Sequence, residues 1–215
     1  MSLTLYGRPR SGSLAVEILL DELGLGYRRV LVTGYRENIQ PASFAAINPL
    51  RQVPALTLED GALLTESAAM MLHLADAHPA AGLAPAQNDP ARAPYLRWMT
   101  YLATTIYPTA MHIFHPENYV ADATRFEEIK AYSTGVLAQQ WQVADAALGQ
   151  DGHFAGGRLS AADLYMVMFA LWFEETPGLG DLANTRRFLE RMKPRPSVQA
   201  ALARASSPEA WAATA

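Results

Sequence analysis

The chain has no cysteine among its 215 residues. Without a thiol, the protein can form no disulfide bond, no thiolate zinc site and no covalent intermediate on a cysteine. Long hydrophobic runs are also missing, because no apolar stretch reaches the roughly 20 residues that a membrane-spanning helix needs. The N-terminal residues lack the basic segment and long apolar core of a signal peptide. We therefore expect a cytoplasmic protein with no membrane partner.

Charged residues are also scarce, at 18% of the chain, and the net charge is -4 with no long basic run. Nucleic-acid-binding proteins carry clustered lysine and arginine, so we expect no nucleic-acid partner. Hydrophobic residues make up 50% of the chain, which is typical of a globular protein with a sizeable core. The length fits one large domain or two small ones.

The first third of the chain alternates between strand and helix patterns. Apolar residues recur at helical spacing after Ser13, and Gly24 ends that helix. Asp60-Gly61 is a tight-turn dipeptide between two apolar runs, which indicates a hairpin. The expected elements are a strand at 3–5, a helix from 13 to 23, a strand at 27–32, a hairpin over 55–64 and a helix from 67. Strand, helix and strand in about thirty residues predict a parallel βαβ unit.

The rest of the chain shows helical periodicity after a segment rich in proline, alanine and glycine at 78–90. We predict an α/β domain over 1–77, a linker over 78–90 and an all-helical domain over 91–215. Pro108 should kink or divide the first long helix, and Pro116 should end it. Ser160 and Asp163 form an S-x-x-D capping box before a strongly apolar helix, and we expect this box to be structural.

The stretch from Asn48 to Ser67 carries the most informative spacing. Pro54 cannot donate to a sheet, so it must lie at a strand start, an edge or a bulge. If the Val53–Pro54 bond is cis, the backbone of Val53 points into a groove and can pair with an extended peptide. Glu66 and Ser67 fall at a helix N-terminus, which favours an anion. An ordinary hairpin that enters a helix would explain the same pattern.

The segments N-P, Q-V-P-A-L, D-G and L-T-E-S within this stretch resemble the glutathione-binding half of the glutathione S-transferases. The resemblance extends to Leu5-Tyr6 upstream and to the box at 160–163 downstream. It implies a thioredoxin-like N-terminal domain followed by a C-terminal helical bundle, in a cytoplasmic homodimer. It also implies a detoxification enzyme that transfers glutathione, its co-substrate, to an electrophilic apolar small molecule without a metal.

The resemblance assigns the residues that hold glutathione. Glu66 is expected to pair with the ammonium of the ligand, and Ser67 with its γ-glutamyl carboxylate. The backbone at Val53 and Pro54 would pair with the peptide, and Gln52 would reach the γ-glutamyl or cysteinyl part. Two arginines, Arg36 and Arg51, are candidates for the glycine carboxylate, although a solvated surface charge explains either one as well.

Three hydroxyl groups near the first strand are candidates for activating the glutathione thiol. The resemblance is closest to the bacterial beta class, but the cysteine of that class aligns with Gly12 here. Classes that use a serine place it at or near Ser11 or Ser13, and other classes use a tyrosine near Tyr6. We prefer Ser11 by a small margin, because Ser13 can serve as a helix cap, and Tyr6 can be a core residue.

A cluster of aromatic, methionine and histidine side chains follows Pro108. We expect it to form the wall of an apolar pocket for the second substrate, although helix packing is the simpler explanation; the residues are Tyr107, Met111, His112, Phe114 and Trp172. The beta class carries a histidine–lysine pair where Tyr107 and Pro108 align. His112 and His115 have no evident third ligand, so we expect no metal. A glutathione-dependent isomerase, dehalogenase or ether-cleaving enzyme, or a non-catalytic binding module, remains an alternative.

Overall fold

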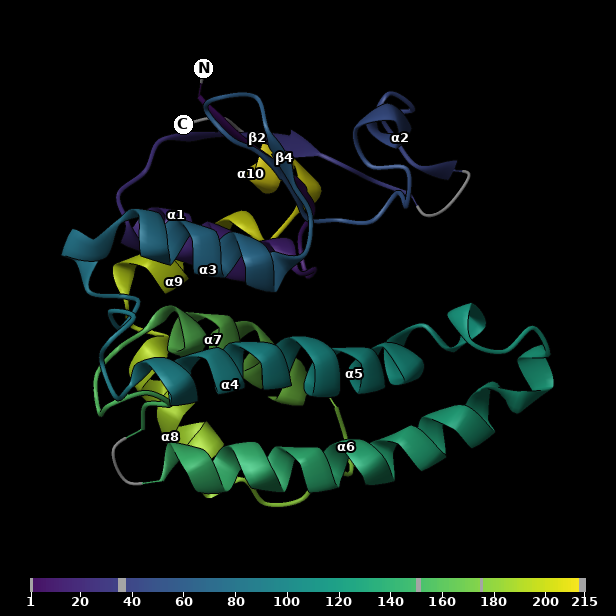
Figure 1. The fold of residues 1–215 in the computed structure, drawn as a ribbon. Coiled ribbons are helices and arrows are strands. Elements are labelled where there is room, and N and C mark those ends of the chain that lie inside the picture. Colours follow the sequence, from purple (N-terminus) through teal and green to yellow (C-terminus); the bar gives the residue numbers. More distant parts are fainter. Residues whose placement is uncertain (1, 35–37, 150–151, 175, 213–215) are drawn as a thin grey trace. The chain divides into compact units, whose positions relative to one another are not determined.

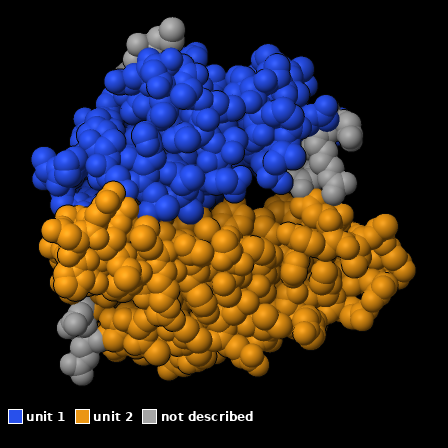
Figure 2. Space-filling model, in the orientation of Figure 1, with its two compact units in different colours: residues 1–84, 193–215 blue, residues 85–192 orange. Residues whose placement is uncertain are grey.

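The computed structural model describes residues 2–34, 38–149, 152–174 and 176–212 (Figure 1). The chain divides into two compact units, Met1–Ala84 with Lys193–Ala215, and Pro85–Met192 (Figure 2). The junction at residues 84 and 85 lies inside the expected linker. The C-terminal residues differ from expectation, because they belong to the first unit and not to the helical one.

A four-stranded mixed sheet organises the first unit, with β1 (Leu3–Gly7), β2 (Tyr27–Leu31), β3 (Ala55–Thr57) and β4 (Leu63–Leu64). The strand order is β2-β1-β3-β4. β1 runs parallel to β2 and antiparallel to β3, so that Tyr6 lies between Val30 and Ala55. β3 and β4 form the expected hairpin around Asp60-Gly61. This arrangement confirms the thioredoxin-like domain.

Helices cover the sheet and bury its apolar side chains. They are α1 (Ser13–Glu22), α2 (Phe44–Ile47) and α3 (Ser67–Ala77), followed by the short turn η2 (Pro79–Ala81). α1 packs against α3, and its residues from Ser13 to Leu20 are all buried. A second apolar cluster forms around Phe44 beside the sheet. The loop between β1 and α1 is therefore held between two well-packed regions.

The C-terminal helices α9 (Pro196–Arg204) and α10 (Pro208–Ala212) pack on α1 and β2 within the first unit (Figure 1). Ion pairs join α9 and the residue before it to α1: Arg195 pairs with Glu22, and Arg204 pairs with Asp21 and Glu17. The sequence pattern of α9 shows that it has an apolar face, but not which core that face joins. The expected domain boundary therefore missed this segment.

The second unit is all helical, as expected. Its elements are α4 (Arg92–Tyr101), η3 (Leu102–Ile106), α5 (Tyr107–Phe114), η4 (Pro116–Asn118), η5 (Ala123–Arg125), α6 (Phe126–Leu148), α7 (Ala161–Glu174) and α8 (Ala183–Met192). α7 is the central helix, and every residue from Ala161 to Ala170 is buried. Among the described residues, each helix is too short or too polar to span a bilayer.

Pro108 changes the helix in a way that the sequence did not specify. The chain winds as a π-helix over Leu102–Ile106 and returns to α-helix at Tyr107. Proline has no N–H to donate, and in an α-helix its ring clashes with the carbonyl four residues earlier, here that of Thr104. A wider π turn at that carbonyl relieves the clash. α5 ends at Phe114, before Pro116, as expected.

Candidate active site

The loop between β1 and α1 holds both candidate serines in one hydrogen-bond network. The Ser11 hydroxyl donates to the carbonyl of Arg8 over 2.8 Å, and the two serine oxygens lie 2.9 Å apart. The Arg8 N–H donates to the Ser13 hydroxyl oxygen over 3.3 Å. Each hydroxyl has only one proton. Because Ser11 uses its proton on Arg8, Ser13 must donate to Ser11.

Burial distinguishes the two serines. Ser13 is the first residue of α1 and is 0% exposed, whereas Ser11 is half-buried. Gly7 lies so close to Ser13 that a Cβ atom at Gly7 would come within 2.1 Å of the Ser13 oxygen. A ligand at the N-terminus of α1 can therefore meet the Ser11 hydroxyl after a rotation, while the Ser13 hydroxyl is enclosed. These contacts favour Ser11 as the donor to a ligand.

Tyr6 lies on the sheet and packs into the apolar cluster around Phe44. The two ring centroids are 5.7 Å apart at 35°, and the cluster also contains Val32, Ile39 and Ala55. Tyr6 is opposite Ala55 in the ladder between β1 and β3. These contacts agree with the core alternative for Tyr6 better than with a thiol-activating role.

Asn48 shapes the loop before the Val53–Pro54 bond. Its buried side-chain amide donates to the Gln52 carbonyl over 2.8 Å, and its side-chain oxygen accepts from the Leu50 N–H over 3.1 Å. The Arg51 N–H donates to the Asn48 carbonyl over 2.8 Å, and Arg51 has a left-handed φ of 56°. One buried side chain thus fixes both the course of the loop and the position of Gln52, which is exposed.

The Val53–Pro54 peptide bond is cis, as the sequence reasoning supposed. The ladder between β1 and β3 begins with Ala55, so Val53 lies beyond the last paired residue of the sheet. Pro54 is buried and Val53 is half-buried. The backbone of Val53 therefore stands where an added extended segment could continue the sheet.

Glu66 and Ser67 lie at the start of α3. Glu66 is exposed and has φ 63° and ψ 107°, a conformation that costs an L-residue about 1–3 kcal/mol. In the described structure, its side chain makes no capping hydrogen bond with α3. Ser67 is buried at the first helical residue, where the helix dipole favours an anion. Backbone strain of this kind is typical of ligand sites.

Arg51 and Arg36 are the two candidates for the glycine carboxylate. Arg51 is half-buried in the loop that Asn48 organises. Arg36 lies outside the described residues. Within the described ranges, no three histidine, aspartate or glutamate side chains come together as a metal-binding group.

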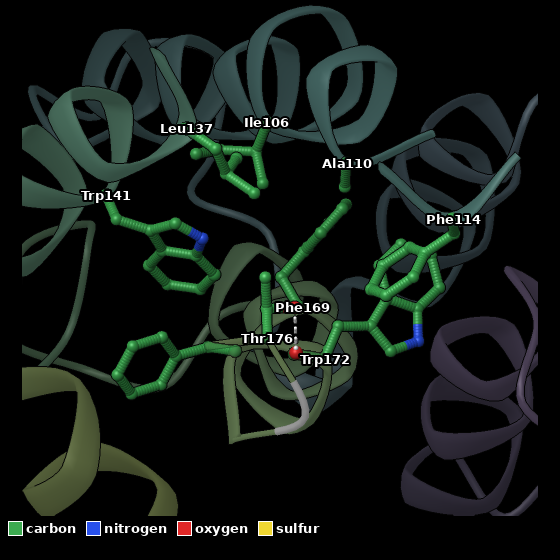
Figure 3. A pocket seen from close by; sticks show the side chains of 9 residues that line it. Ile106, Ala110, Phe114, Leu137, Trp141, Phe169, Trp172 and Thr176 are labelled. Carbon is green, nitrogen blue, oxygen red and sulfur yellow. Dashed lines mark hydrogen bonds between the residues drawn. The ribbon is translucent and has the colours of Figure 1, made fainter. Parts of the chain in front are cut away.

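Part of the expected second-substrate wall forms one aromatic cluster in the second unit. Tyr107 and Phe114 both meet Trp172 edge-on, with ring centroids 5.3 Å and 5.9 Å apart. Phe114 and Trp172 also line a cavity between α5, α6 and α7 (Figure 3). About 10 Å³ of that cavity admits a water-sized sphere, which is room for about one water molecule. The cavity itself is too small for an organic substrate.

His112 and Met111 do not join the aromatic cluster around Trp172. The His112 Nδ1 atom lies 3.3 Å from the Ser133 hydroxyl on α6, and its ring packs edge-on against Tyr119 at 4.1 Å. Met111 is half-buried on α5. The structure therefore brings three of the five expected residues together and directs His112 toward α6.

Two family models match the chain. The N-terminal domain of glutathione S-transferase matches residues 12–77, and the C-terminal domain of glutathione S-transferase matches residues 105–196. The chain belongs to the glutathione S-transferase family. The first match covers three strands of the sheet, β2, β3 and β4, and the second covers most of the helical unit, from α5 to α8. Curated relatives of the chain include named glutathione S-transferases.

Individual relatives of this glutathione S-transferase cover between 78% and 93% of the chain. The glutathione S-transferase GstA of Escherichia coli O157:H7 is 32% identical over 92% of this chain and 96% of its own. The maleylacetoacetate isomerase of Pseudomonas aeruginosa is 31% identical over 78% of both chains. A transferase homologue from Sulfitobacter, crystallised with bound glutathione, is 30% identical, has a TM-score of 0.81, and covers 93% of this chain and 96% of its own.

Several residues that shape the site were missed by sequence reasoning. Asn48 belongs to the motif, but its loop-holding role depends on burial that the letters do not show. Glu17 is buried on α1, and Trp211 is buried at the C-terminal end. The available signals were a lone charge in the apolar run S-L-A-V-E-I-L-L and a lone tryptophan in an alanine-rich tail.

Proposed function

We propose that the protein binds glutathione on its N-terminal unit and transfers the glutathione sulfur, as a thiolate, to an electrophilic apolar small molecule. The observation that carries the proposal is the half-buried Ser11 hydroxyl at the N-terminus of α1, in a chain with no thiol of its own. The reacting thiol is then that of glutathione. It loses its proton to solvent, the sulfur bonds to the electrophilic carbon, and the leaving group departs with the bonding electron pair.

Ser11 is proposed to stabilise the thiolate by rotating its proton from the Arg8 carbonyl to the sulfur. A thiol of pKa ~8.5 needs about 2.7 kcal/mol of differential stabilisation to fall by two units. A hydrogen bond to a charged group contributes about 1.5–3 kcal/mol. A helix N-terminus adds about 0.3–1 kcal/mol at an exposed site. Together these two effects reach the required magnitude without a protein cysteine.

The rest of the N-terminal site is proposed to hold the peptide. Glu66 pairs with the γ-glutamyl ammonium, and Ser67 binds the carboxylate at the start of α3. The Val53 backbone pairs with the cysteinyl part in a strand-like manner, beside Pro54. Gln52 reaches the γ-glutamyl or cysteinyl part, and Arg51 or Arg36 binds the glycine carboxylate.

The second substrate is proposed to contact apolar side chains of the helical unit. Tyr107, Phe114 and Trp172 supply aromatic surface. Met111 is proposed to add a flexible apolar contact, and His112 a polar contact. We also propose that the protein acts as a homodimer in the cytoplasm and detoxifies its electrophiles.

Glutathione transfer to an aryl halide tests the proposal through Glu66→Ala. Losing a charge-assisted contact should raise the KM for glutathione about 10- to 100-fold. Glu59→Ala is the matched control, because Glu59 is also an exposed acid of the same unit and lies in the hairpin turn. An unchanged KM in Glu66→Ala would refute the assigned clamp, and absence of turnover in the wild type would favour a binding module.

Glutathione-dependent isomerisation is a second candidate, favoured by the 31% identity to an isomerase. The two reactions differ in their use of glutathione. Transfer consumes one glutathione per turnover and releases a thioether, whereas isomerisation adds glutathione to a double bond and then regenerates it. Measuring free glutathione during turnover of a cis-configured unsaturated keto acid separates them. Constant glutathione with a changed double bond supports isomerisation.

A further inference from the structure

The C-terminal segment brings one fully buried tryptophan to the loop that carries Ser11 and Ser13. Trp211 lies on α10, which packs against β2 in the first unit (Figure 1). A Cβ atom added to Gly7 would lie 2.1 Å from the Ser13 oxygen and 3.0 Å from Cζ2 of Trp211. The indole ring and the Ser13 hydroxyl therefore close around the same point at the end of β1.

Trp211 is fixed from two sides. Its indole N–H donates to the Glu17 carboxylate over 2.5 Å, and its carbonyl accepts from Arg29 Nε over 2.8 Å. Glu17 is 1% exposed and lies one helical turn after Ser13 on α1. The second oxygen of Glu17 accepts from Arg204 Nε over 3.0 Å. α1, β2 and the C-terminal helices thus hold the ring in one orientation.

Arg204 connects this contact to the rest of α1. Its guanidinium also pairs with Asp21 and donates to the Tyr27 hydroxyl over 3.2 Å. The pair of Arg204 with Glu17 is largely buried, with side-chain exposures of 18% and 1%. A charge placed this deeply is stabilised only when its hydrogen bonds are made. The network therefore resists displacement of Trp211.

We propose that Trp211, held by Glu17 and Arg204, is a positioning residue for activation of the glutathione thiol. This inference depends on the proposed function, in which Ser11 donates to the sulfur. The ring and Ser13 pack around the same point at Gly7, and Ser13 donates to Ser11, so the Ser11 oxygen is held in position while its proton turns from the Arg8 carbonyl to the sulfur. A hydroxyl whose oxygen is already in place stabilises a developing charge more effectively than one whose oxygen must also move.

Trp211→Ala tests the inference through the pH dependence of kcat/KM for the electrophile at saturating glutathione, which reports the pKa of the bound thiol. The apparent pKa of the bound thiol should rise by about one unit, which lowers kcat/KM about tenfold on the acid side. At a pH below the pKa of the bound thiol, the KM for glutathione should remain the same, because glutathione binds there as a thiol and Glu66 and Ser67 are untouched. Trp211→Phe keeps most of the ring and should recover most of the shift. A rise in KM with no change in the pH profile would instead indicate a merely structural role.

Glu22→Gln is the matched control. Glu22 also joins α1 to the C-terminal segment, through Arg195 and the Ser197 hydroxyl at 2.5 Å. It lies at the last residue of α1, at the opposite end from Ser13. Glu22→Gln should weaken the attachment of the C-terminal segment to α1 and leave the pH profile of kcat/KM unchanged. An equal shift in Glu22→Gln would overturn the specific role of Trp211.

The double variant with Ser11→Ala separates this inference from the proposed function. If Trp211 acts through the serines, Trp211→Ala should cause no further shift in the Ser11→Ala background. If Ser11→Ala raises the thiol pKa and Trp211→Ala and Trp211→Phe do not, the positioning role is wrong and the serine mechanism stands. If the wild-type thiol is ionised and Ser11→Ala changes nothing, the serine mechanism fails and the positioning role with it.

Discussion

Replacing Asp163 with alanine should strongly destabilise the helical unit. Its carboxylate is 0% exposed and accepts three hydrogen bonds at the start of α7. The donors are the Phe154 N–H at 2.9 Å, the Ser160 N–H at 2.7 Å and the Ser160 hydroxyl at 2.8 Å. The expected capping box is therefore present, and it also ties the preceding loop to the helix.

The magnitude follows from the donors that alanine would leave behind. A hydrogen bond to a charged group contributes about 1.5–3 kcal/mol, and a buried donor left unpaired costs a similar amount. Allowing water to reach part of the vacated space, we expect Asp163→Ala to lose about 4 kcal/mol of unfolding free energy. Asp163→Asn should lose about 2–3 kcal/mol, because an amide presents its NH2 group to one of the donors. Ser160→Ala should lose about 1 kcal/mol.

Urea unfolding monitored by tryptophan fluorescence measures these losses. Trp98 stacks on Phe154 with ring centroids 4.5 Å apart, so it reports on the loop that Asp163 holds. Asp122→Ala is the control, since Asp122 accepts similar hydrogen bonds from Thr124 at an exposed site and should matter far less. A loss below about 1.5 kcal/mol in Asp163→Ala, or an equal loss in the control, would refute the reasoning.

Four further predictions concern pH, glutathione and the second substrate. Burial raises the pKa of Glu17 above 4.5. Ionisation of Glu17 therefore lowers the free energy of unfolding as the pH rises past 4.5, and Glu17→Gln should flatten the stability curve above that pH. Burial acts to raise the pKa of Glu22, but hydrogen bonds from Arg195 and Ser197 lower it below 4.5. The stabilisation by ionised Glu22 is therefore lost as the pH falls below 4.5, and Glu22→Gln should flatten the acid limb of the stability curve. Denaturant midpoints measured across pH test both glutamate predictions. Asn48→Ala should raise the KM for glutathione several-fold without changing kcat, as measured by steady-state kinetics. A fall in kcat alone would contradict this prediction. Trp172→Ala should raise the KM for a bulky aryl substrate more than that for a small one, and equal changes would count against its proposed place in the wall.

The local elements of the fold could be predicted because their signals are short-range. Helical spacing after Ser13, the Asp60-Gly61 turn and the box at Asp163 each depend on neighbouring residues. The partner of the C-terminal helices could not be predicted, because an amphipathic pattern shows that a face is buried without showing against what. The π-helical segment before Pro108 could not be predicted from the sequence either, because a kink or a wider π turn would each relieve the clash of the proline ring.

The candidate site was predicted as a set of residues, and the structure narrows the choice within it. The family resemblance left Ser11, Ser13 and Tyr6 as alternatives. The enclosure of Ser13 and the packing of the Tyr6 ring on Phe44 favour Ser11 as the proposed donor to a ligand, and this choice stays a prediction. The Arg8 carbonyl accepts the Ser11 proton, which makes Ser13 the donor in the hydrogen bond between the two serines. No residue pattern shows where that carbonyl points.

The ionisation of bound glutathione tests the central claim most directly. Ultraviolet difference absorbance of the thiolate should be followed across pH for the wild type, Ser11→Ala and Ser13→Ala. We predict that wild-type protein ionises bound glutathione well below the free thiol pKa of about 8.5, and that Ser11→Ala loses most of this shift. Ser13→Ala should lose less of it. Glutathione bound as a neutral thiol, or an unchanged shift in Ser11→Ala, would contradict the account.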